Sequence, residues 1–428
     1  MHTRDTLSSS SPSWKQNLVT IWIAELIAIV GFSVVIPLLP LYISELGVQS
    51  ERSVRLWSGA IFSAHAVSMA IFAPLWGALS DRYGRKVMVE RAMFAGAVII
   101  VLMGLAQNVQ QLVILRVLQG ALTGTVTAAN ALVATNTPKR HLGYALGMLQ
   151  MAIYVGASAG PLLGGLVADT VGYRAAFWTT GGLLFIAALG VLFFVRESFI
   201  PTVSRSSQSS SSRSTRGWQE VRRRVRERFS PFLQNSALRN VMTIRLLMRL
   251  GARLLSPVLP LFIAAIALPG TRIASTTGFI SGASSLAGAV GALVMGRLGD
   301  RIGYRSILVA CAFLSVACYA PQALVHDPRW LLPFQAGTGL AMGGILASLS
   351  ASLAHLAPEG REGIVYGVDA TVVSIANAIG PMAGSALAAW IGLRPPFLVA
   401  AAVFGVAGLV AMQLLPRVSD DPQKGKGE

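Results

Sequence analysis

Charge is scarce in this sequence. Only 12% of its 428 residues are Asp, Glu, Lys or Arg, whereas an ordinary soluble domain carries roughly 25%. Hydrophobic residues make up 54% of the chain, which is more apolar side chain than a water-soluble globule can hide. The shortage of charge therefore excludes an ordinary soluble protein and indicates a chain that folds in a membrane.

Cysteine and the common catalytic motifs are also nearly absent. The two cysteines, Cys311 and Cys318, lie in one apolar run, and on a helix their Cα atoms would be about 10 Å apart, too far for a disulfide. The chain has no Gly-Lys-Ser/Thr phosphate-binding loop, no cluster with metal-ligand spacing and no nucleophile beside a base. We therefore expect no enzyme, no metal site, no cofactor and no ATP-driven pump.

Long apolar runs recur along the whole chain. A helix of about 20 residues crosses a hydrocarbon core of about 30 Å, and twelve runs of this kind are present. They are predicted at 17–43, 57–79, 88–106, 112–136, 143–168, 174–195, 238–268, 277–298, 306–325, 330–356, 363–390 and 395–416. The expected fold is an all-α membrane protein with twelve transmembrane helices.

The basic residues indicate orientation. Lys and Arg number 35 against 18 Asp and Glu, a formal net charge of +17, and most of them fall in loops on one side of the apolar runs. Because cytoplasmic loops are enriched in Lys and Arg, both termini are predicted to be cytoplasmic, and no nucleic-acid partner is needed. No removable signal peptide is expected, so the chain is predicted to be a multi-pass protein of the inner or plasma membrane.

One long polar segment, residues 196–237, divides the chain. Its first part is rich in serine, and in its basic part Trp218, Val221, Val225 and Phe229 share one helical face. This pattern fits a helix lying on an anionic inner leaflet, or a merely solvated basic linker. The predicted organisation is a tail at 1–16, a six-helix bundle at 17–195, the cytoplasmic linker at 196–237, a second bundle at 238–416 and a tail at 417–428.

The two bundles repeat one another. A charged segment, Gly77–Lys86, joins the second and third runs, and a similar segment, Gly296–Arg305, lies 219 positions later. Three further stretches match at offsets of 219 or 220, and they include Pro37 with Pro257, Gly160-Pro161 with Gly380-Pro381, and Arg116 with Gln335. Two parallel six-helix repeats are typical of transporters.

These motifs carry a resemblance. Gly77–Lys86 is similar to the loop between the second and third helices of the major facilitator superfamily, and Gly156–Gly165 is similar to the Gly-Pro-Gly-Gly motif of its proton-coupled exporters. Pro37 and Pro40 fit its first-helix signature, and Arg116 fits its fourth-helix basic motif. Over nearly its whole length, the chain resembles the twelve-helix drug:proton antiporter branch and its bacterial multidrug resistance exporters.

The resemblance implies a gate and a helix contact. In the family the loop holds the inner side shut, with Asp81 facing the start of the eleventh helix and Arg85 paired to a carboxylate; a simple basic anchor is the alternative. The predicted gating residues are Gly77, Asp81, Arg82, Gly84, Arg85, Asp300 and Arg301. The predicted antiporter motif is Gly156, Gly160, Pro161, Gly164 and Gly165, whose spacing also permits a purely packing contact between two helices.

Ionisable residues inside the runs are candidates for proton coupling, since burying a charge in lipid costs several kcal/mol. Glu25 and Asp369 are the carboxylates, and either can carry a proton or form a structural pair with a cation. Arg116 occupies the position that the family ties to proton coupling. The alternative is an arginine whose side chain extends to the outer membrane interface. A lone His65 is more often a packed residue than a proton shuttle.

The seventh run carries three arginines, Arg245, Arg249 and Arg253, on one helical face. Three arginines facing lipid would be very costly, and in the superfamily this helix lines the central cavity. We therefore place Arg249, Arg253 and the apolar Phe32 at a substrate cavity whose excess of positive charge suits anionic or zwitterionic substrates. Arg245 can instead extend to the inner headgroups.

The predicted function is proton-coupled export of amphipathic small molecules by alternating access. The alternative within transport is uptake or exchange of an organic anion through Arg249 and Arg253, and the alternative from another class is a transporter-like sensor or scaffold. The expected partners are a small-molecule substrate, protons and the lipid bilayer, with the proton gradient as driver. The protein is expected to act as a monomer.

Overall fold

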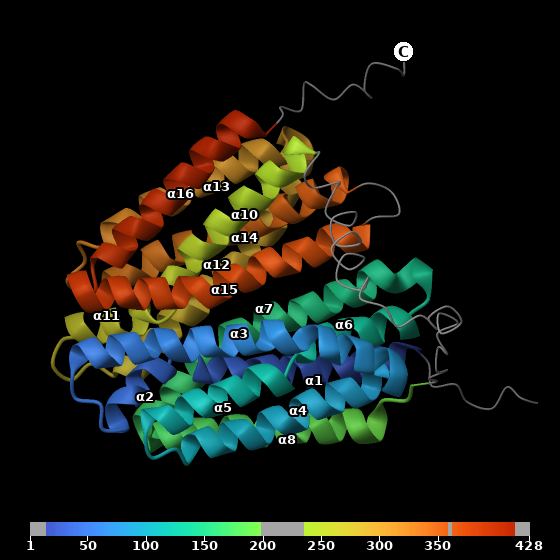
Figure 1. Cartoon of the computed structure of the whole chain (residues 1–428), viewed down its shortest axis with the longest axis horizontal. Helices are drawn as coiled ribbons and strands as arrows, with labels where there is room; N and C mark the ends of the chain where they lie inside the picture. The colour runs from blue at the N-terminus through green and yellow to red at the C-terminus, as the bar shows by residue number, and fades with distance from the viewer. Residues whose placement is uncertain (1–13, 198–234, 358–361, 416–428) are drawn as a thin grey trace, which may run out of the picture. The chain divides into compact units, whose positions relative to one another are not determined.

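The computed structural model describes residues 14–197, 235–357 and 362–415. The regular elements of this described part are helices (Figure 1). The amphipathic segment predicted around Trp218 and both tails lie mainly outside the described residues, as does the side chain of Asp81. Nothing structural is therefore assigned to them.

Twelve helical segments of the described chain are long and apolar enough to cross a membrane, which confirms the predicted fold class. The predicted first, fourth and seventh runs are each divided into two helices. The helices are α1 (Trp14–Val35), α2 (Leu39–Glu45), α3 (Glu51–Tyr83), α4 (Arg85–Gly104), α5 (Val109–Leu122), α6 (Thr125–Asn136), α7 (Leu142–Val171), α8 (Tyr173–Phe194), α10 (Ser236–Leu254), α11 (Val258–Ile266), α12 (Ile273–Ile302), α13 (Tyr304–Gln322), α14 (Pro328–Leu356), α15 (Glu362–Ile391) and α16 (Pro395–Leu414).

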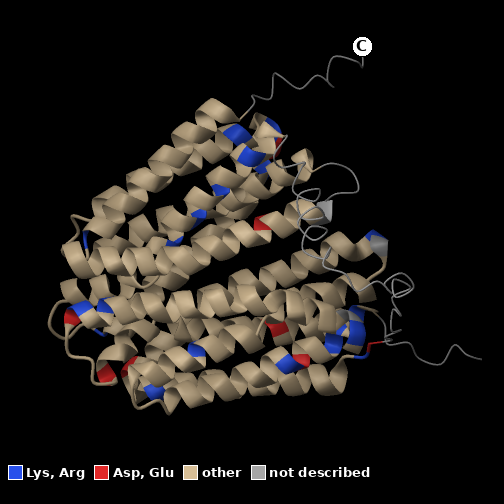
Figure 2. Ribbon diagram, viewed as in Figure 1, with Lys and Arg blue, Asp and Glu red and all other residues tan. Residues whose placement is uncertain are grey.

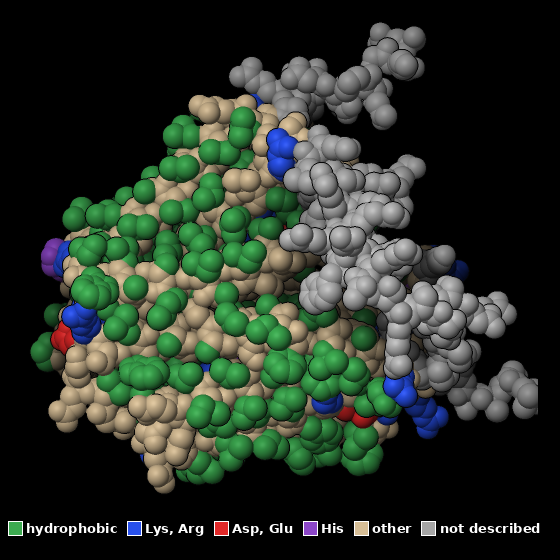
Figure 3. All heavy atoms as spheres, in the orientation of Figure 1, with side chains coloured by type: hydrophobic (Ala, Val, Ile, Leu, Met, Phe, Trp, Pro, Cys, Tyr) green, Lys and Arg blue, Asp and Glu red, His purple; other side chains and the backbone are tan. Residues whose placement is uncertain are grey.

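The surface fits a lipid environment. Large apolar side chains are widely exposed, with Ile71 66% and Phe193 70% exposed, and hydrophobic side chains predominate along the helices in Figure 3. Most charged residues lie near helix ends, and only a few lie within the helices (Figure 2). A soluble protein rarely exposes apolar surface so continuously, and these few internal charges are the ones that need an explanation.

The expected ten-residue loop at Gly77–Lys86 is wrong in its extent. Helix α3 continues through Tyr83 and α4 begins at Arg85, so Gly84 alone separates them, with φ +96°. Gly303 separates α12 from α13 in the same way, with φ +91°. Within the two gating segments, Gly84 and Gly303 are the glycines with a positive φ, a conformation that glycine adopts without steric cost. Gly77 lies inside α3 with open space around the position of a Cβ, so the turn does not require it.

The internal repeat extends to individual contacts. The rings of Tyr42 and Phe177 have centroids 4.9 Å apart, and so do those of Phe262 and Phe397, the residues 220 positions later. The first span breaks between α1 and α2 at residues 36–38, and the seventh breaks between α10 and α11 at 255–257. Each break contains a proline, which cannot continue a helix without losing a backbone hydrogen bond.

The repeat is not perfect. The fourth span breaks after Leu122, where Gly124 has φ +132°. The equivalent position in α14 is Gly343, which lies inside a continuous helix. The first bundle therefore contains a discontinuous helix directly after Arg116 and Gln119 that the second bundle lacks.

The chain forms two compact units. One consists of residues 1–49, 64–202 and 270–282, and the other of 50–63, 203–269 and 283–428. In the first unit, the carboxylate of Asp169 accepts hydrogen bonds from the backbone N–H groups of Ala274 and Ser275 at the start of α12. In the second unit, Arg55 of α3 donates to the carbonyl of Ala388 at 3.1 Å. The beginnings of α3 and α12 thus pack with the helices of the other sequence half.

Candidate functional site

Among the described residues of the first unit, Glu25 is the most deeply buried carboxyl group. It lies in the middle of α1 and is 1% exposed. Neither carboxyl oxygen has a hydrogen-bond partner among the described residues. An ionised carboxylate in such a place would cost several kcal/mol, so this geometry suits a side chain that carries a proton while it is buried.

The glycines of α7 bring that helix against α1 next to Glu25. A Cβ on Gly156 would lie within 3 Å of Ile29, and a Cβ on Gly164 would lie 2.7 Å from the carbonyl oxygen of Val34. At these glycines the backbones of α7 and α1 lie in close contact. Gly165 instead faces the backbone of Ala274 at the start of α12. Pro161 lies inside α7, and its role in export stays a prediction.

Arg116 is buried in α5 and is 5% exposed. Its guanidinium donates to the side-chain oxygen of Gln119 at 2.6 Å, one turn further along the helix. The guanidinium also interacts electrostatically with His65 of α3, which packs there because Gly120 of α5 lies directly against the His65 carbonyl. Arg116 therefore lies at an α3–α5 contact, and Glu25 forms no ion pair with it in the described structure.

In the second unit, a group of charged side chains lies between α10 and α15. Arg245 forms an ion pair with Asp369, and these residues are 7% and 9% exposed. Arg249 interacts electrostatically with the same carboxylate. Asp369 therefore has the cationic neighbours that Glu25 lacks, and the structure separates two carboxylates that look alike in the sequence.

Arg253, the third arginine of this face, has a different partner. Its Nε donates to the side-chain oxygen of Asn377 on α15 at 2.7 Å. Sequence reasoning did not single out Asn377, although an amide inside an apolar helix is a signal of the same kind as an intramembrane charge. Phe32, placed in the same predicted cavity, is half-buried with its ring against Gly96 of α4.

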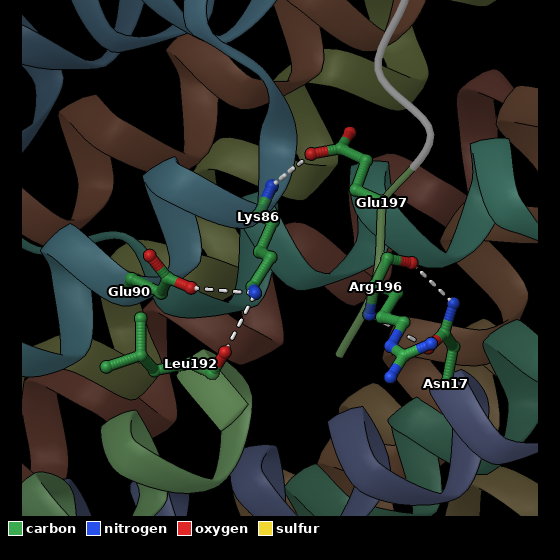
Figure 4. A network of polar contacts seen from close by, with 6 residues as sticks. All are labelled: Asn17, Lys86, Glu90, Leu192, Arg196 and Glu197. Atoms are coloured by element: carbon green, nitrogen blue, oxygen red, sulfur yellow. Dashed lines mark hydrogen bonds and ion pairs between the residues drawn. The ribbon is translucent and has the colours of Figure 1, made fainter. Parts of the chain in front are cut away.

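One end of the first unit holds a polar network around the start of α4 (Figure 4). The Glu197 carboxylate accepts hydrogen bonds from the backbone N–H groups of Arg85 at 3.1 Å and Lys86 at 2.8 Å. The first backbone N–H groups of a helix lack partners within the helix and attract anions. Sequence reasoning missed Glu197; the available signal was an acidic residue directly after the last apolar run of the bundle.

Two further contacts complete this network. Lys86 donates to the carbonyl of Leu192 at 2.9 Å and pairs with Glu90 at 3.4 Å. Asn17 exchanges two hydrogen bonds with the backbone of Arg196, at 2.8 and 3.2 Å. The start of α1, the start of α4 and the segment that follows α8 are thereby tied together where the predicted linker begins (Figure 4).

The second copy of the gating segment is tied differently. The Tyr304 hydroxyl donates to the carboxylate of Asp300 one turn away on the chain. Arg305 donates to the carbonyl of Met412. This repeats the contact of Lys86 with Leu192, with offsets of 219 and 220 positions for the two partners. Arg82 lies 5.4 Å from the Tyr83 ring centroid, Arg301 is exposed, and the described residues contain no group of metal-binding side chains.

Comparison with known proteins places this architecture among transporters. The sequence model of the Major Facilitator Superfamily matches residues 21–273 and 241–428. The chain is 34% identical over 397 residues to multidrug resistance protein MdtG of Klebsiella pneumoniae (strain 342), covering 92% of this chain and 93% of the relative. It is 35% identical over 391 residues to MdtG of Salmonella typhimurium, covering 91% and 93%.

A solved structure has the same fold. The inward-facing, unoccupied crystal structure of a bacterial homologue of the human lysosomal transporter Spinster superposes with a TM-score of 0.73 over 95% of this chain and 98% of that one. The sequence identity is 14%, so this likeness concerns the fold alone.

Proposed function

This chain belongs to the major facilitator superfamily, and from that membership we propose that it is a proton-coupled exporter of amphipathic small molecules. Its relatives at about 35% identity are multidrug resistance proteins, and the family membership makes it a transporter rather than an enzyme. These relatives and the twelve apolar helices of the described chain together indicate a multi-pass inner-membrane protein. The direction of transport, the proton coupling and the cytoplasmic placement of both termini belong to the proposal.

The burial of Glu25 without a partner supports the proton-coupling part of this proposal. This carboxyl group is almost completely buried and has no hydrogen-bond or ion-pair partner among the described residues. Removal from water disfavours the charged form of a carboxyl group, so a conformation that hydrates Glu25 would release its proton and one that buries it again would need a proton. A side chain of this kind couples proton movement to alternating access.

Arg116 and the gating segment have supporting roles in this proposal. Gln119 orients the Arg116 guanidinium, which supplies a fixed positive charge inside the first unit and tunes the coupling. Glu197 holds the start of α4, so the segment around Gly84 is anchored to its own bundle. Asp81, on the last turn of α3, would then make or release the inner contact as the two halves rock.

Flux through reconstituted protein tests the proposal. In proteoliposomes with an imposed pH gradient, efflux of a fluorescent dye should depend on the gradient, collapse with a protonophore and be lost in Glu25→Gln. Glu51→Gln is the matched control, because the Glu51 side chain is 83% exposed. Full efflux in both the protonophore and the Glu25→Gln arms would contradict proton-coupled export.

A second transport function has one observation in its favour. The face of α10 carries three arginines; Asp369 pairs with Arg245 and interacts electrostatically with Arg249, whereas Arg253 donates to the neutral Asn377. Exchange or uptake of an organic anion through Arg249 and Arg253 would use this charge, and vesicles loaded with an anionic dye would show flux that persists without a pH gradient. The sensor or scaffold alternative gains no support from any contact in the structure.

A further inference from the structure

The three arginines of α10 have unequal surroundings. Arg245 is ion-paired with Asp369, and Arg249 interacts with the same carboxylate. Two cations therefore share one anion. Arg253 interacts with a neutral amide, Asn377, so its charge has no carboxylate partner within the described chain.

Arg253 is also held in place at two points. Helices α10 and α15 approach so closely that a Cβ on Gly380 would lie 2.6 Å from the Cβ of Arg253. Further along the side chain, Nε is bonded to Asn377, one turn earlier on α15. A guanidinium fixed at its base and at Nε needs little further ordering to bind a ligand, which favours affinity.

The terminal guanidinium nitrogens of Arg253 have no hydrogen-bond partner in the described part of the chain. Arg253 is exposed, whereas Arg245 is only 7% exposed. The hydrogen bond from its Nε to Asn377 is its polar contact among the described residues. Two terminal N–H groups in a planar fork match the two oxygens of a carboxylate, or of a phosphonate or sulfonate of the same charge.

We propose that Arg253, positioned by Asn377, binds the acidic group of an anionic or zwitterionic amphipathic substrate, and that Arg245 and Arg249 serve Asp369 instead. This inference rests on the proposed transport function, and it narrows the substrate site to one arginine. Arg253 is the substrate ligand. Asn377 is a positioning residue, which leaves the terminal nitrogens of Arg253 uncovered because an amide carries no charge.

The test is equilibrium binding to the purified full-length protein in nanodiscs, without any ion gradient. The probes are carboxyfluorescein as the anion and rhodamine 6G as the cation, followed by fluorescence anisotropy. Arg253→Gln should weaken carboxyfluorescein binding by about tenfold or more, because a charge-assisted bidentate bond is lost, and should change rhodamine 6G binding by less than about twofold.

Two variants of Asn377 distinguish positioning from structure. Asn377→Asp places a carboxylate on Arg253 and should reproduce the loss seen in Arg253→Gln while keeping the arginine. Asn377→Ala keeps the charge but frees the side chain, so carboxyfluorescein binding should fall by a smaller factor. Arg329→Gln, which removes an exposed arginine of the same unit, is the control and should leave both probes unaffected.

The outcomes separate the two proposals. Equal losses for both probes in Arg253→Gln, or unchanged carboxyfluorescein binding in a variant with wild-type thermal stability, would overturn the role of Arg253. Selective loss of anion binding together with gradient-independent flux would leave Arg253 in place and reject proton-coupled export. If Arg253→Gln fails to fold, the Asn377→Asp result decides, since that variant retains the arginine.

Discussion

The carboxylate of Glu197 accepts the backbone N–H of Lys86 at 2.8 Å, and this contact joins the end of the first bundle to the start of α4. The two residues are separated by four of the predicted transmembrane helices. A negative charge at the first turn of a helix stabilises it through the unpaired N–H groups and the helix dipole. The anchor of the first gating segment is therefore a residue at the border of the linker.

Glu197→Gln should weaken this anchor. The amide can accept one hydrogen bond but has no charge, so we expect a loss of about 0.5–1 kcal/mol in stability and a reduced transport rate. Differential scanning fluorimetry and dye flux measure the two effects. Glu51, an exposed carboxylate at the start of α3, pairs among the described residues only with Arg55, one turn later, so Glu51→Gln should cost less stability than Glu197→Gln and leave the transport rate unchanged. An identical response of both variants would show that the position of Glu197 is unimportant.

The two aspartates of the gating segments should differ in importance. Asp300 accepts a hydrogen bond from Tyr304 on its own unit, and Arg85 takes the place of Tyr304 in the first copy. We expect Asp81→Asn to reduce transport more than Asp300→Asn, because Asp300 already has a local partner. Initial rates of dye efflux at matched protein levels check the order. The reverse order would assign the main inner contact to the second copy.

Glu25 should be needed for function but costly for stability. Burying a polar group without a hydrogen bond costs about 1–3 kcal/mol, and Met fills a similar volume without that cost. Glu25→Met is therefore expected to raise the melting temperature while abolishing gradient-driven flux. A lower melting temperature would indicate that the carboxyl group has a stabilising partner.

The glycines of α7 should tolerate no side chain where they face α1. Gly164→Val should destabilise the protein by about 2 kcal/mol or more, because the Val34 carbonyl lies where its Cβ would be. Gly147 lies on the same helix with open space around the position of a Cβ. Gly147→Ala should therefore be neutral or slightly stabilising. Unfolding followed by intrinsic fluorescence gives both values.

The Arg245–Asp369 pair should behave as a coupled unit. Removing either partner leaves a buried charge, so Asp369→Leu or Arg245→Leu alone is expected to cost about 3–5 kcal/mol. The double variant should cost clearly less than the sum of the two single changes, as a double-mutant cycle would show. Additive losses would mean that the ion pair contributes no coupling energy in the membrane.

The sequence predicts the fold well because its evidence is local or repeated. Apolar runs long enough to span a bilayer predict the twelve helices. The paired breaks at Pro37 and Pro257 were not predicted, because hydropathy alone treats each run as one continuous helix. The repeat offset also predicts contact pairs such as Phe262 with Phe397 once Tyr42 with Phe177 is known. The extent of the gating loop was overestimated, since charged residues near a helix end look like a loop when only hydropathy is considered.

What the sequence by itself determined about this protein is its class: twelve membrane helices in two repeats, of a family of transporters. Only the tertiary structure decided which ionisable groups have partners. Glu25 and Asp369 are both carboxylates within apolar runs, yet Asp369 meets Arg245 on α10 and Glu25 meets no described partner. Hydropathy and periodicity depend on each residue and its near neighbours, whereas ion pairing depends on which helices lie side by side. In this protein, the close contacts at Gly156, Gly164 and Gly380 determine that arrangement.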